Sequence, residues 1–411
     1  MTESNIRKVC IVFPNELEII YSIIHAMGGE CRIIGGAVRD YLMDKTPVDF
    51  DIATNVPPQR ILESFIKNKI KAIPLGIEYG TILVVVNNVN FEITTLRKDF
   101  KCFGRHAEVE FSKSWEEDAS RRDFTINAMS ITADRVLYDY FDGQNDLKKR
   151  IVRFIGNPEK RIQEDYLRIL RYIRFLSILG LKNLDQESYY YSFKAIKSLK
   201  NISRPRIKKE LSKILKAEFL KEILIVLYQK NLYEYVGLSQ IFIKEDVLKQ
   251  IVFTEQDWLA NLAVLICLSE KKNPNMLTDI KDELSLSNEE FKKLKILCSF
   301  KHRDTFDNHD HYKYLHELDR KLYLRLLFVI NNIIPLHEYK RYYQEALTYK
   351  PLNFPLRGED LKSLKLQGDK IGQYLKIAKS HWHNNNNKLD RLSLMHFLSV
   401  LLKTTNGNKN S

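Results

Sequence analysis

The sequence predicts an α+β protein in which a mixed sheet with covering helices comes first and an all-helical part follows. Two observations lead to this prediction. Short apolar or alternating runs, separated by glycine, proline and asparagine turns, recur between residues 31 and 141. Helical spacing of apolar residues takes over from residue 162, and glycine becomes rare beyond residue 180. The chain of 411 residues has room for about two to four domains.

The charge balance points to an anionic partner. The chain has 65 Lys and Arg against 52 Asp and Glu, which leaves a net charge of +13. Such an excess favours polyanions, nucleic acid above all, although a basic proteome would give the same figure.

Cysteine usage and hydropathy favour a cytoplasmic protein with free thiols. The five cysteines are scattered and form no C-x-x-C pair, as expected in a reducing compartment without a zinc site. The start of the chain has no basic segment followed by a long apolar core, and the apolar run 259–268 is too short to span a membrane. We therefore expect no membrane anchor.

The segment 32–54, RIIGGAVRDYLMDKTPVDFDIAT, carries the first candidate site. An apolar strand runs into Gly35-Gly36 and then into a helix with Arg39 and Asp40 in its first turn. Two glycines let the backbone approach an anion closely, and the start of a helix offers unpaired N–H groups to phosphate. Taken alone, a Gly-Gly pair is usually only a turn.

The run from Val48 to Ile52 alternates strictly, so Asp49 and Asp51 share one side of a strand and the apolar residues point to the other. Two adjacent carboxylates repel each other unless a cation lies between them, and Mg²⁺ prefers one or two carboxylates together with substrate phosphates. A D-x-D pair alone usually does not bind a metal ion. After a phosphate-binding turn, however, it indicates nucleotidyl or phosphoryl transfer.

The next elements extend the predicted sheet. Helices are expected over 15–29 and 57–69, strands over 82–86 and 90–96 with a turn at Asn87-Asn88, and a last strand over 137–141. Glu92 lies on the second of these strands. Beside the strand of the Asp pair it would complete a carboxylate cluster, and otherwise it is a solvent-facing side chain of a hairpin.

Two further motifs follow. Residues 97–118 are polar and hard to assign to a regular element, so we expect a long loop or lid. In RRDFTINAM, Arg121 and Arg122 suit a triphosphate, because guanidinium groups bind phosphate oxygens in pairs. Asp123 and Asn127 are four apart and on a helix would face together, within reach of a ribose.

One helix is predicted over residues 162–179. Glu164, Asp165, Arg168 and Arg171 mark one side of it. A carboxylate and a guanidinium three residues apart are most often a surface ion pair. Held rigidly, the same two groups could read the edge of a nucleotide base.

In combination these motifs resemble one family. GGAVRD with VDFDIAT, GIEYGT, RRDFTINAM and EDYLRILR are similar to the motifs of the class II nucleotidyltransferases, namely the bacterial-type CCA-adding enzymes and their poly(A) polymerase relatives. The resemblance implies a head like that of DNA polymerase beta, followed by helical parts. The expected domains are a catalytic head (1–150), a nucleotide-selecting neck (151–220), an RNA-binding body (221–345) and a tRNA-binding tail (346–411).

The resemblance also implies an activity and a set of roles. The enzyme would add CCA to tRNA 3′ ends from CTP and ATP, by two-metal nucleotidyl transfer with Mg²⁺ and release of pyrophosphate. Asp49 and Asp51 would hold the metals, with Glu92 as a third catalytic carboxylate. The other roles would be phosphate binding by Gly35, Gly36, Arg39 and Arg122, ribose binding by Asp123 and Asn127, base contacts by Asp165 and Arg168, and support by Arg121, Glu164 and Arg171.

Several points depart from the family pattern or stay open. Tyr79 replaces a usual histidine, and Pro205 replaces a usual glutamate in a fifth motif, ISRPRIKKEL, where Ser203 is a plausible helix cap. The loop 97–118, with Gly104-Arg105 and Trp115, resembles the loop that CCA-adding enzymes use in switching from C to A. Addition of only A or only CC, poly(A) synthesis, or an inactive RNA-binding relic are the alternatives, and the sequence does not give the oligomeric state.

Overall fold

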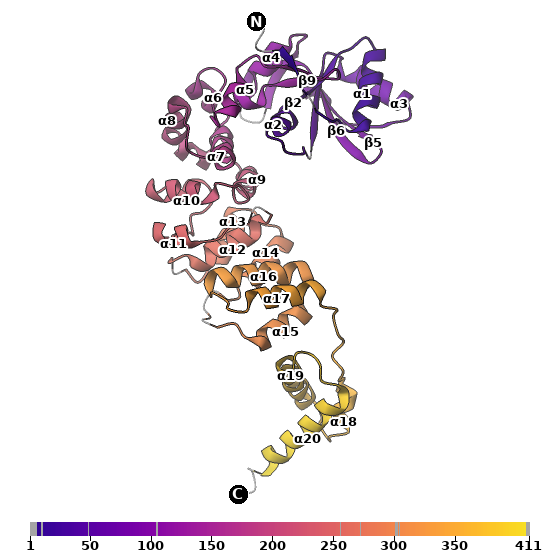
Figure 1. Ribbon diagram of the computed structural model, residues 1–411, viewed down its shortest axis with the longest axis vertical. Helices are drawn as coiled ribbons and strands as arrows, with labels where there is room; N and C mark the ends of the chain where they lie inside the picture. Colours follow the sequence, from indigo (N-terminus) through magenta and orange to yellow (C-terminus); the bar gives the residue numbers. More distant parts are fainter. Residues whose placement is uncertain are drawn as a thin grey trace. The chain divides into compact units, whose positions relative to one another are not determined.

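The computed structural model describes residues 6–9, 11–47, 49–103, 106–254, 256–271, 273–300, 303 and 305–407. It divides into two compact units, Met1–Ser239 and Gln240–Ser411. The sheet and the first helices after it belong to the first unit (Figure 1).

An eight-stranded mixed sheet forms the centre of the first unit. Its strand order is β1-β10-β9-β2-β3-β6-β5-β4. These strands are β1 (Ile6–Lys8), β2 (Cys31–Ile34), β3 (Phe50–Thr54), β4 (Lys71–Gly76), β5 (Thr81–Val86), β6 (Val89–Thr95), β9 (Ser130–Thr132) and β10 (Val136–Tyr138). The predicted α+β class is confirmed. The predicted strands correspond to β2, β3, β5, β6 and β10, whereas β1, β4 and β9 were not predicted because they are too short or too irregular to give a clear pattern.

Apolar side chains join the sheet to its covering helices. The helices α1 (Asn15–Ala26) and α3 (Pro58–Lys67) lie together at one side of the sheet (Figure 1), and α2 (Gly36–Leu42) contacts β2 and β3. The core includes Leu17 and Phe65 from the helices and Ile33, Ile52 and Phe91 from the strands, all fully buried.

A tight turn connects β5 to β6. Asn87 and Asn88 both have positive φ, at 49° and 67°, which is the backbone of the two-residue hairpin turns that match strand twist. The turn sets the register at Val86 opposite Val89 and continues it to Thr81 opposite Thr94. The hairpin that the sequence predicted is therefore confirmed.

At one edge of the sheet, β4 pairs with β5 alone among the described strands. The pairing is irregular because its register shifts between Pro74 and Gly76. Proline has no N–H to donate, so it is found in edge strands and at such irregular points.

The segment 97–118 differs from the expected irregular loop. Strands β7 (Arg97–Phe103) and β8 (His106–Phe111) form a separate two-stranded antiparallel sheet, and α4 (Trp115–Ser120) follows. The Ser114 side chain accepts a hydrogen bond from the Glu117 N–H and caps α4. The first strand shows no clear alternation, whereas in the second Ala107, Val109 and Phe111 alternate with Glu108 and Glu110, a signal that sequence reasoning overlooked. Gly104-Arg105 lies outside the described residues.

Helices complete the first unit. They are α5 (Gly143–Lys148), α6 (Pro158–Glu164), α7 (Leu167–Leu179), α8 (Gln186–Lys194), α9 (Arg204–Ile214) and α10 (Leu220–Gln229), with short 3₁₀ segments η2 (Ile77–Tyr79), η3 (Thr125–Asn127), η4 (Ile196–Asn201) and η5 (Tyr233–Tyr235). Helix α7 packs against α9 and α10, with Ile169, Leu170 and Leu176 buried.

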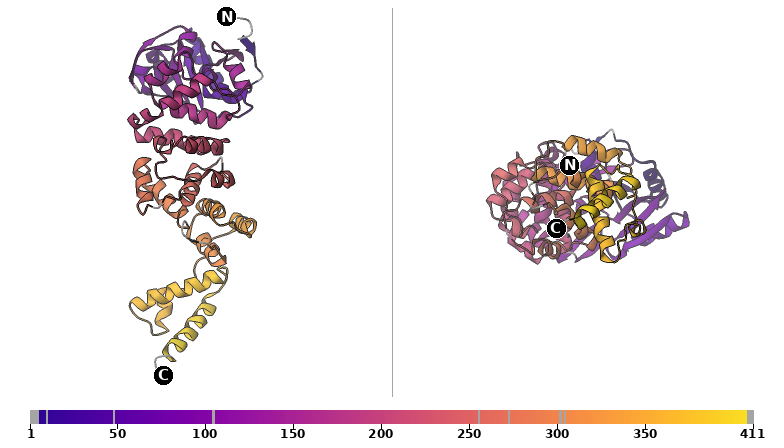
Figure 2. Two further views of the ribbon diagram at one scale, coloured as in Figure 1. Left: turned by 90° about the vertical axis from the view of Figure 1, so that its left-hand side faces the viewer. Right: turned by 90° about the horizontal axis from the view of Figure 1, so that it is seen from below.

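The second unit consists of helices, without a strand among its described residues (Figure 2). They are α11 (Glu245–Gln250), α12 (Trp258–Leu268), α13 (Met276–Glu283), α14 (Asn288–Leu297), α15 (Asn308–Glu317), α16 (Arg320–Ile333), α17 (Tyr339–Thr348), α18 (Gly358–Lys362), α19 (Asp369–Asn384) and α20 (Arg391–Gly407). Across the described part of the chain, no helix combines the length and apolar character that crossing a membrane requires.

Candidate active site

The acidic pair lies where the sequence placed it. Phe50 and Ile52 are buried, whereas Asp51 is exposed on the other face of β3 and Asp49 is exposed just before the strand. Val48 lies outside the described residues. Because β3 and β6 pair in parallel with Asp51 opposite Glu92, the third carboxylate is the direct neighbour of the second.

The three carboxylates influence one another. Partial burial raises the pKa of Asp51, with Arg122 opposing the rise and Asp49 adding to it. Burial also raises the pKa of Glu92, with further contributions from Asp51 and Asp49. Within the residues that the structure describes, no group of three or more His, Cys, Asp or Glu side chains is arranged to hold a metal ion. The charges of Asp51 and Asp49 thus act on Glu92.

The Gly35-Gly36 turn brings the backbone close to an arginine. Gly35 has φ of +70°, a conformation that favours glycine, and a Cβ there would lie 3.2 Å from Nη1 of Arg122. Helix α2 begins at Gly36. A side chain at position 35 would therefore be strained by the positive φ and would push against the end of the Arg122 guanidinium.

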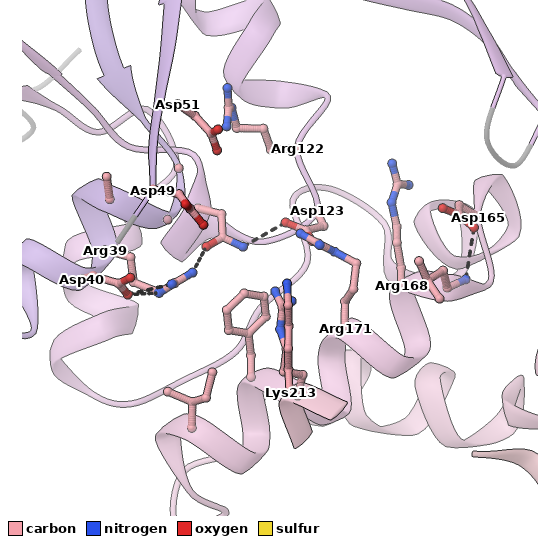
Figure 3. A pocket seen from close by; sticks show the side chains of 18 of the residues that line it. Arg39, Asp40, Asp49, Asp51, Arg122, Asp123, Asp165, Arg168, Arg171 and Lys213 are labelled. Carbon is pink, nitrogen blue, oxygen red and sulfur yellow. Dashed lines mark hydrogen bonds and ion pairs between the residues drawn. The ribbon is translucent and has the colours of Figure 1, made fainter. Parts of the chain in front are cut away.

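The second motif forms a hydrogen-bonded chain that starts at Arg39. The Arg39 guanidinium donates to Oδ1 of Asn127 at 2.8 Å, and the Asn127 amide donates to Oδ1 of Asp123 at 3.0 Å (Figure 3). Arg171 from α7 donates to Oδ2 of Asp123 at 2.5 Å. Asp123 and Asn127 do face each other as predicted, but not on an α-helix: Asn127 ends the 3₁₀ turn η3, and Asp123 lies just before that turn.

The single helix expected over 162–179 is interrupted. Asp165 has an extended backbone, with φ of −154° and ψ of 106°, between α6 and α7. Its Oδ1 accepts the Leu167 N–H at 3.1 Å, which caps the start of α7, and its Oδ2 accepts a hydrogen bond from Arg206 at 2.7 Å. The bond to Leu167 is local and the bond to Arg206 comes from a distant part of the chain; together they hold the extended backbone at Asp165 in place of the helix that the apolar spacing implied.

Asp165 and Arg168 consequently have separate partners. Arg168 forms an ion pair with Glu164 and also donates to the carbonyl of Arg161. Arg161 contacts the same Glu164 carboxylate and donates to the carbonyls of Arg121 and Arg122. Through Arg161, the turn of the second motif is connected to the end of α6.

Helix α9 supplies the remaining charged partners. It begins after Ser203, whose side chain makes no capping bond, so the predicted cap is wrong in this detail; the proline at position 205 is accommodated in the first turn. Glu210 is buried and forms an ion pair with Arg174 at 2.8 Å. Burial lowers the pKa of Arg174 to about 10, with Glu210 opposing the change.

Most of these groups line one cavity of about 820 Å³ in the first unit (Figure 3). The lining residues are Gly35, Gly36, Ala37, Arg39, Asp40, Asp49, Asp51, Arg97, Arg121, Arg122, Asp123, Asn127, Asp165, Leu167, Arg168, Arg171, Arg174, Phe175, Ile178, Arg206 and Lys213. Every candidate residue is among them except Glu92 and Glu164.

Sequence reasoning missed several lining residues. Arg174 continues the spacing of three residues from Arg168 and Arg171, so helical periodicity could have found it. Arg206 lies in the fifth motif, but sequence reasoning assigned it no function. No sequence pattern marked Arg97 and Lys213 as site residues, because only the fold brings them to the cavity.

The comparisons with known proteins identify the family of the chain and its fold. Residues 31–153 match the family model described as the poly A polymerase head domain. This match and the fold of the first unit place the chain in the class of nucleotidyltransferases.

The relatives narrow the class. The chain is 33% identical over 405 residues to human CCA tRNA nucleotidyltransferase 1, mitochondrial, covering 94% of this chain and 90% of the relative. It is 40% identical over 225 residues to the CCA-adding enzyme of Bacillus subtilis, and this match covers 54% of this chain and 55% of the relative. The chain belongs to the CCA tRNA nucleotidyltransferase family. Because the human relative is named as mitochondrial, the cytoplasmic location stays a prediction.

Solved structures support the fold. A Bacillus stearothermophilus CCA-adding enzyme in complex with CTP has a TM-score of 0.76 at 23% identity, covering 96% of this chain and 100% of that one. A Thermotoga maritima CCA-adding enzyme complexed with tRNA has a TM-score of 0.64 at 18% identity, and the match covers 97% of this chain and 99% of that one.

The Glu210 ion pair gives a prediction about stability. Glu210→Ala leaves Arg174 buried without its carboxylate, which is expected to lower the free energy of unfolding by about 3 kcal/mol. Urea denaturation of the variant and the wild type measures the difference. The exposed Glu218→Ala is the matched control, and Arg174→Met/Glu210→Met should recover most of the loss because no unpaired charge remains. A single variant as stable as the wild type would contradict the role of this ion pair.

Proposed function

We propose that this chain adds CCA to the 3′ ends of tRNA from CTP and ATP, with release of pyrophosphate. The observation that carries the proposal is one cavity that combines an acidic pair, several arginines and the Asp165 and Arg168 side chains. The names of the relatives support it, since the human protein is a CCA tRNA nucleotidyltransferase and two neighbours bind CTP and tRNA respectively.

The acidic pair suits divalent cations such as Mg²⁺. Asp49 and Asp51 are adjacent oxygen donors, and part of the pKa rise of Asp51 comes from Asp49, a repulsion that a cation would relieve. Two bound ions would neutralise charge on the triphosphate and favour ionisation of the tRNA 3′ hydroxyl. In this proposal Asp49 and Asp51 bind the cations, and Glu92 contributes negative charge beside them.

The arginines would hold the nucleotide. Guanidinium groups donate paired hydrogen bonds to phosphate oxygens, which suits Arg39, Arg121 and Arg122 for the triphosphate. The Gly35-Gly36 turn leaves the backbone open to the same phosphates. Fixing the triphosphate against the acidic pair would orient the α-phosphorus toward the attacking hydroxyl.

The ribose would lie against the second motif, where Asp123 and Asn127 are already oriented by each other and by Arg171. Buried groups with fixed partners lose little entropy when a hydroxyl binds to them.

Base selection would depend on Asp165 and Arg168. Cytosine and adenine both present an amino group next to a ring nitrogen acceptor, whereas uracil and guanine present a carbonyl at that position. A carboxylate acceptor and a guanidinium donor complement the first pattern. The two groups also bond to Arg206 and Glu164, which hold their side chains in place, so a base that contacts them would share or replace these partners.

A second candidate is a poly(A) polymerase, favoured by the description of the matched head-domain model. Enzymes that add only A or only CC would use the same cavity. An inactive RNA-binding relic is opposed by the retention of Asp49, Asp51, Asp165 and Arg168 around one cavity.

The deciding experiment is extension of a tRNA lacking its last three nucleotides, resolved at single-nucleotide length. We expect two additions with CTP alone and a third only when ATP is also present. A long A ladder would identify a poly(A) polymerase, A addition only to a CC-ended tRNA would identify an A-adding enzyme, and stopping after two C with both nucleotides a CC-adding enzyme. No extension would leave an RNA-binding relic.

Asp49→Ala is expected to abolish nucleotide addition while tRNA binding survives, because it removes one of the two carboxylates proposed to hold the cations. Single-turnover extension and a tRNA filter-binding assay measure the two properties. Glu63→Ala, an exposed acid on α3, is the matched control. Unimpaired addition by Asp49→Ala would remove this residue from the metal role.

Arg168→Ala is expected to relax the choice among the four nucleotides, because it removes the proposed donor to the base edge. We expect the preference for CTP over UTP to fall by about tenfold, the size of one charged hydrogen bond. The ratio of kcat/KM for the two nucleotides is the measurement, with the exposed Arg60→Ala as control. Unchanged selectivity would contradict base reading by Arg168.

A further inference from the structure

Asp118 in α4 is a buried carboxylate at the back of the candidate site. It is 3% exposed and does not line the cavity. Its Oδ1 accepts a hydrogen bond from Nε of Arg121 at 2.9 Å, and its Oδ2 accepts one from Nη2 of Arg122 at 3.1 Å. One carboxylate thus contacts both arginines of the second motif.

The same carboxylate contacts a third element. The backbone N–H of Arg97, the first residue of β7, donates to Oδ1 of Asp118 at 3.4 Å. The other end of the hairpin is fixed nearby, since the Ser112 N–H donates to the Leu96 carbonyl at 2.8 Å. Asp118 therefore connects the base of the β7–β8 hairpin to the two arginines.

Asp118 lies between two positive charges that repel each other. Arg121 and Arg122 are adjacent in sequence and both reach the cavity, where like charges repel each other. Burial disfavours the ionised form of Asp118, but Arg122 and Arg121 outweigh burial and hold the pKa of this carboxyl below its usual range. Asp118 is therefore ionised at neutral pH and offsets part of the repulsion.

The contacts with Asp118 also restrict how the two guanidinium groups can turn. A guanidinium group that already donates through one edge can turn only to a limited extent, and its remaining N–H groups point in a fixed direction. Pre-oriented donors lose less entropy when an anion binds than freely rotating ones do. A buried partner behind the site can thus change nucleotide affinity without touching the nucleotide.

We propose that Asp118 is a positioning residue for nucleotide binding, which orients Arg121 and Arg122 toward the triphosphate and ties them to the base of the β7–β8 hairpin. The inference rests on the proposed function, because it takes a nucleoside triphosphate as the ligand of the cavity. It predicts an effect on nucleotide affinity and little effect on the chemical step.

The test is Asp118→Asn, which keeps the size of the side chain and removes its charge. We expect the KM for CTP to rise by about tenfold, as for one lost hydrogen bond to a charged group, with kcat changed by less than about threefold. The exposed neighbour Glu116→Gln is the matched control, with an unchanged KM. A purely structural role would lower the melting temperature and leave the KM of the folded protein as in the wild type, which would overturn the proposal.

A second comparison covers the case in which Asp118→Asn does not fold. Asp118→Asn/Arg121→Gln removes one charge of each sign, so it leaves fewer unpaired charges than the single variant. Compared with Arg121→Gln alone, its KM for CTP should be at least about threefold higher, because Arg122 has lost its partner. Equal KM values would overturn the proposal. Wild-type protein in the same assay separates the two hypotheses: its failure to extend tRNA would contradict the proposed function itself.

Discussion

The candidate site depends on buried carboxylates that hold guanidinium groups in place. Asp123 fixes Arg171, and Glu210 fixes Arg174, so the second motif, α7 and α9 are joined by ion pairs beneath the cavity. The pKa of Asp123 is lowered because Arg171 and further hydrogen bonds outweigh its burial, which keeps the carboxylate ionised. Breaking such a pair would leave a charge in a poorly solvated place, so the elements that carry the partners cannot separate without a large cost. The packing of these helices and the position of the cavity are consequences of one set of contacts.

The cavity also illustrates how a basic protein distributes its charge. Arginines from α2, β7, α7, α9 and the turn after α4 line it. Of the acidic residues that contact these arginines, half line the cavity as well (Asp40, Asp123 and Asp165) and half do not (Asp118, Glu164 and Glu210). Water screens exposed charges, but partly enclosed ones act on a ligand over a longer range. A highly anionic ligand would therefore be attracted by several groups at once.

Sequence reasoning predicted the parts of the fold and site that follow from local patterns. The alternation around Asp51 and the turn at Asn87-Asn88 reflect side-chain period and turn chemistry, and both are confirmed. The helix break at Asp165 was missed because the apolar spacing continues through it, whereas the break comes from a cap to Leu167 and an ion pair with Arg206, 41 residues away. Contacts between residues distant in sequence, such as those that bring Lys213 to the cavity, leave no periodic signal. The comparisons test the fold and the family, while the roles of single residues stay predictions.

The irregular edge strand has a consequence for the behaviour of the protein at high concentration. An exposed strand edge is a template on which another chain can add a strand, and long, flat edges lead to aggregation. In β4 the proline at position 74 removes one donor and the register shift before Gly76 bends the edge, so an approaching chain would meet an interrupted row of hydrogen-bonding groups. This edge of the eight-stranded sheet is therefore a poorer template for an added strand than a straight, unbroken edge would be.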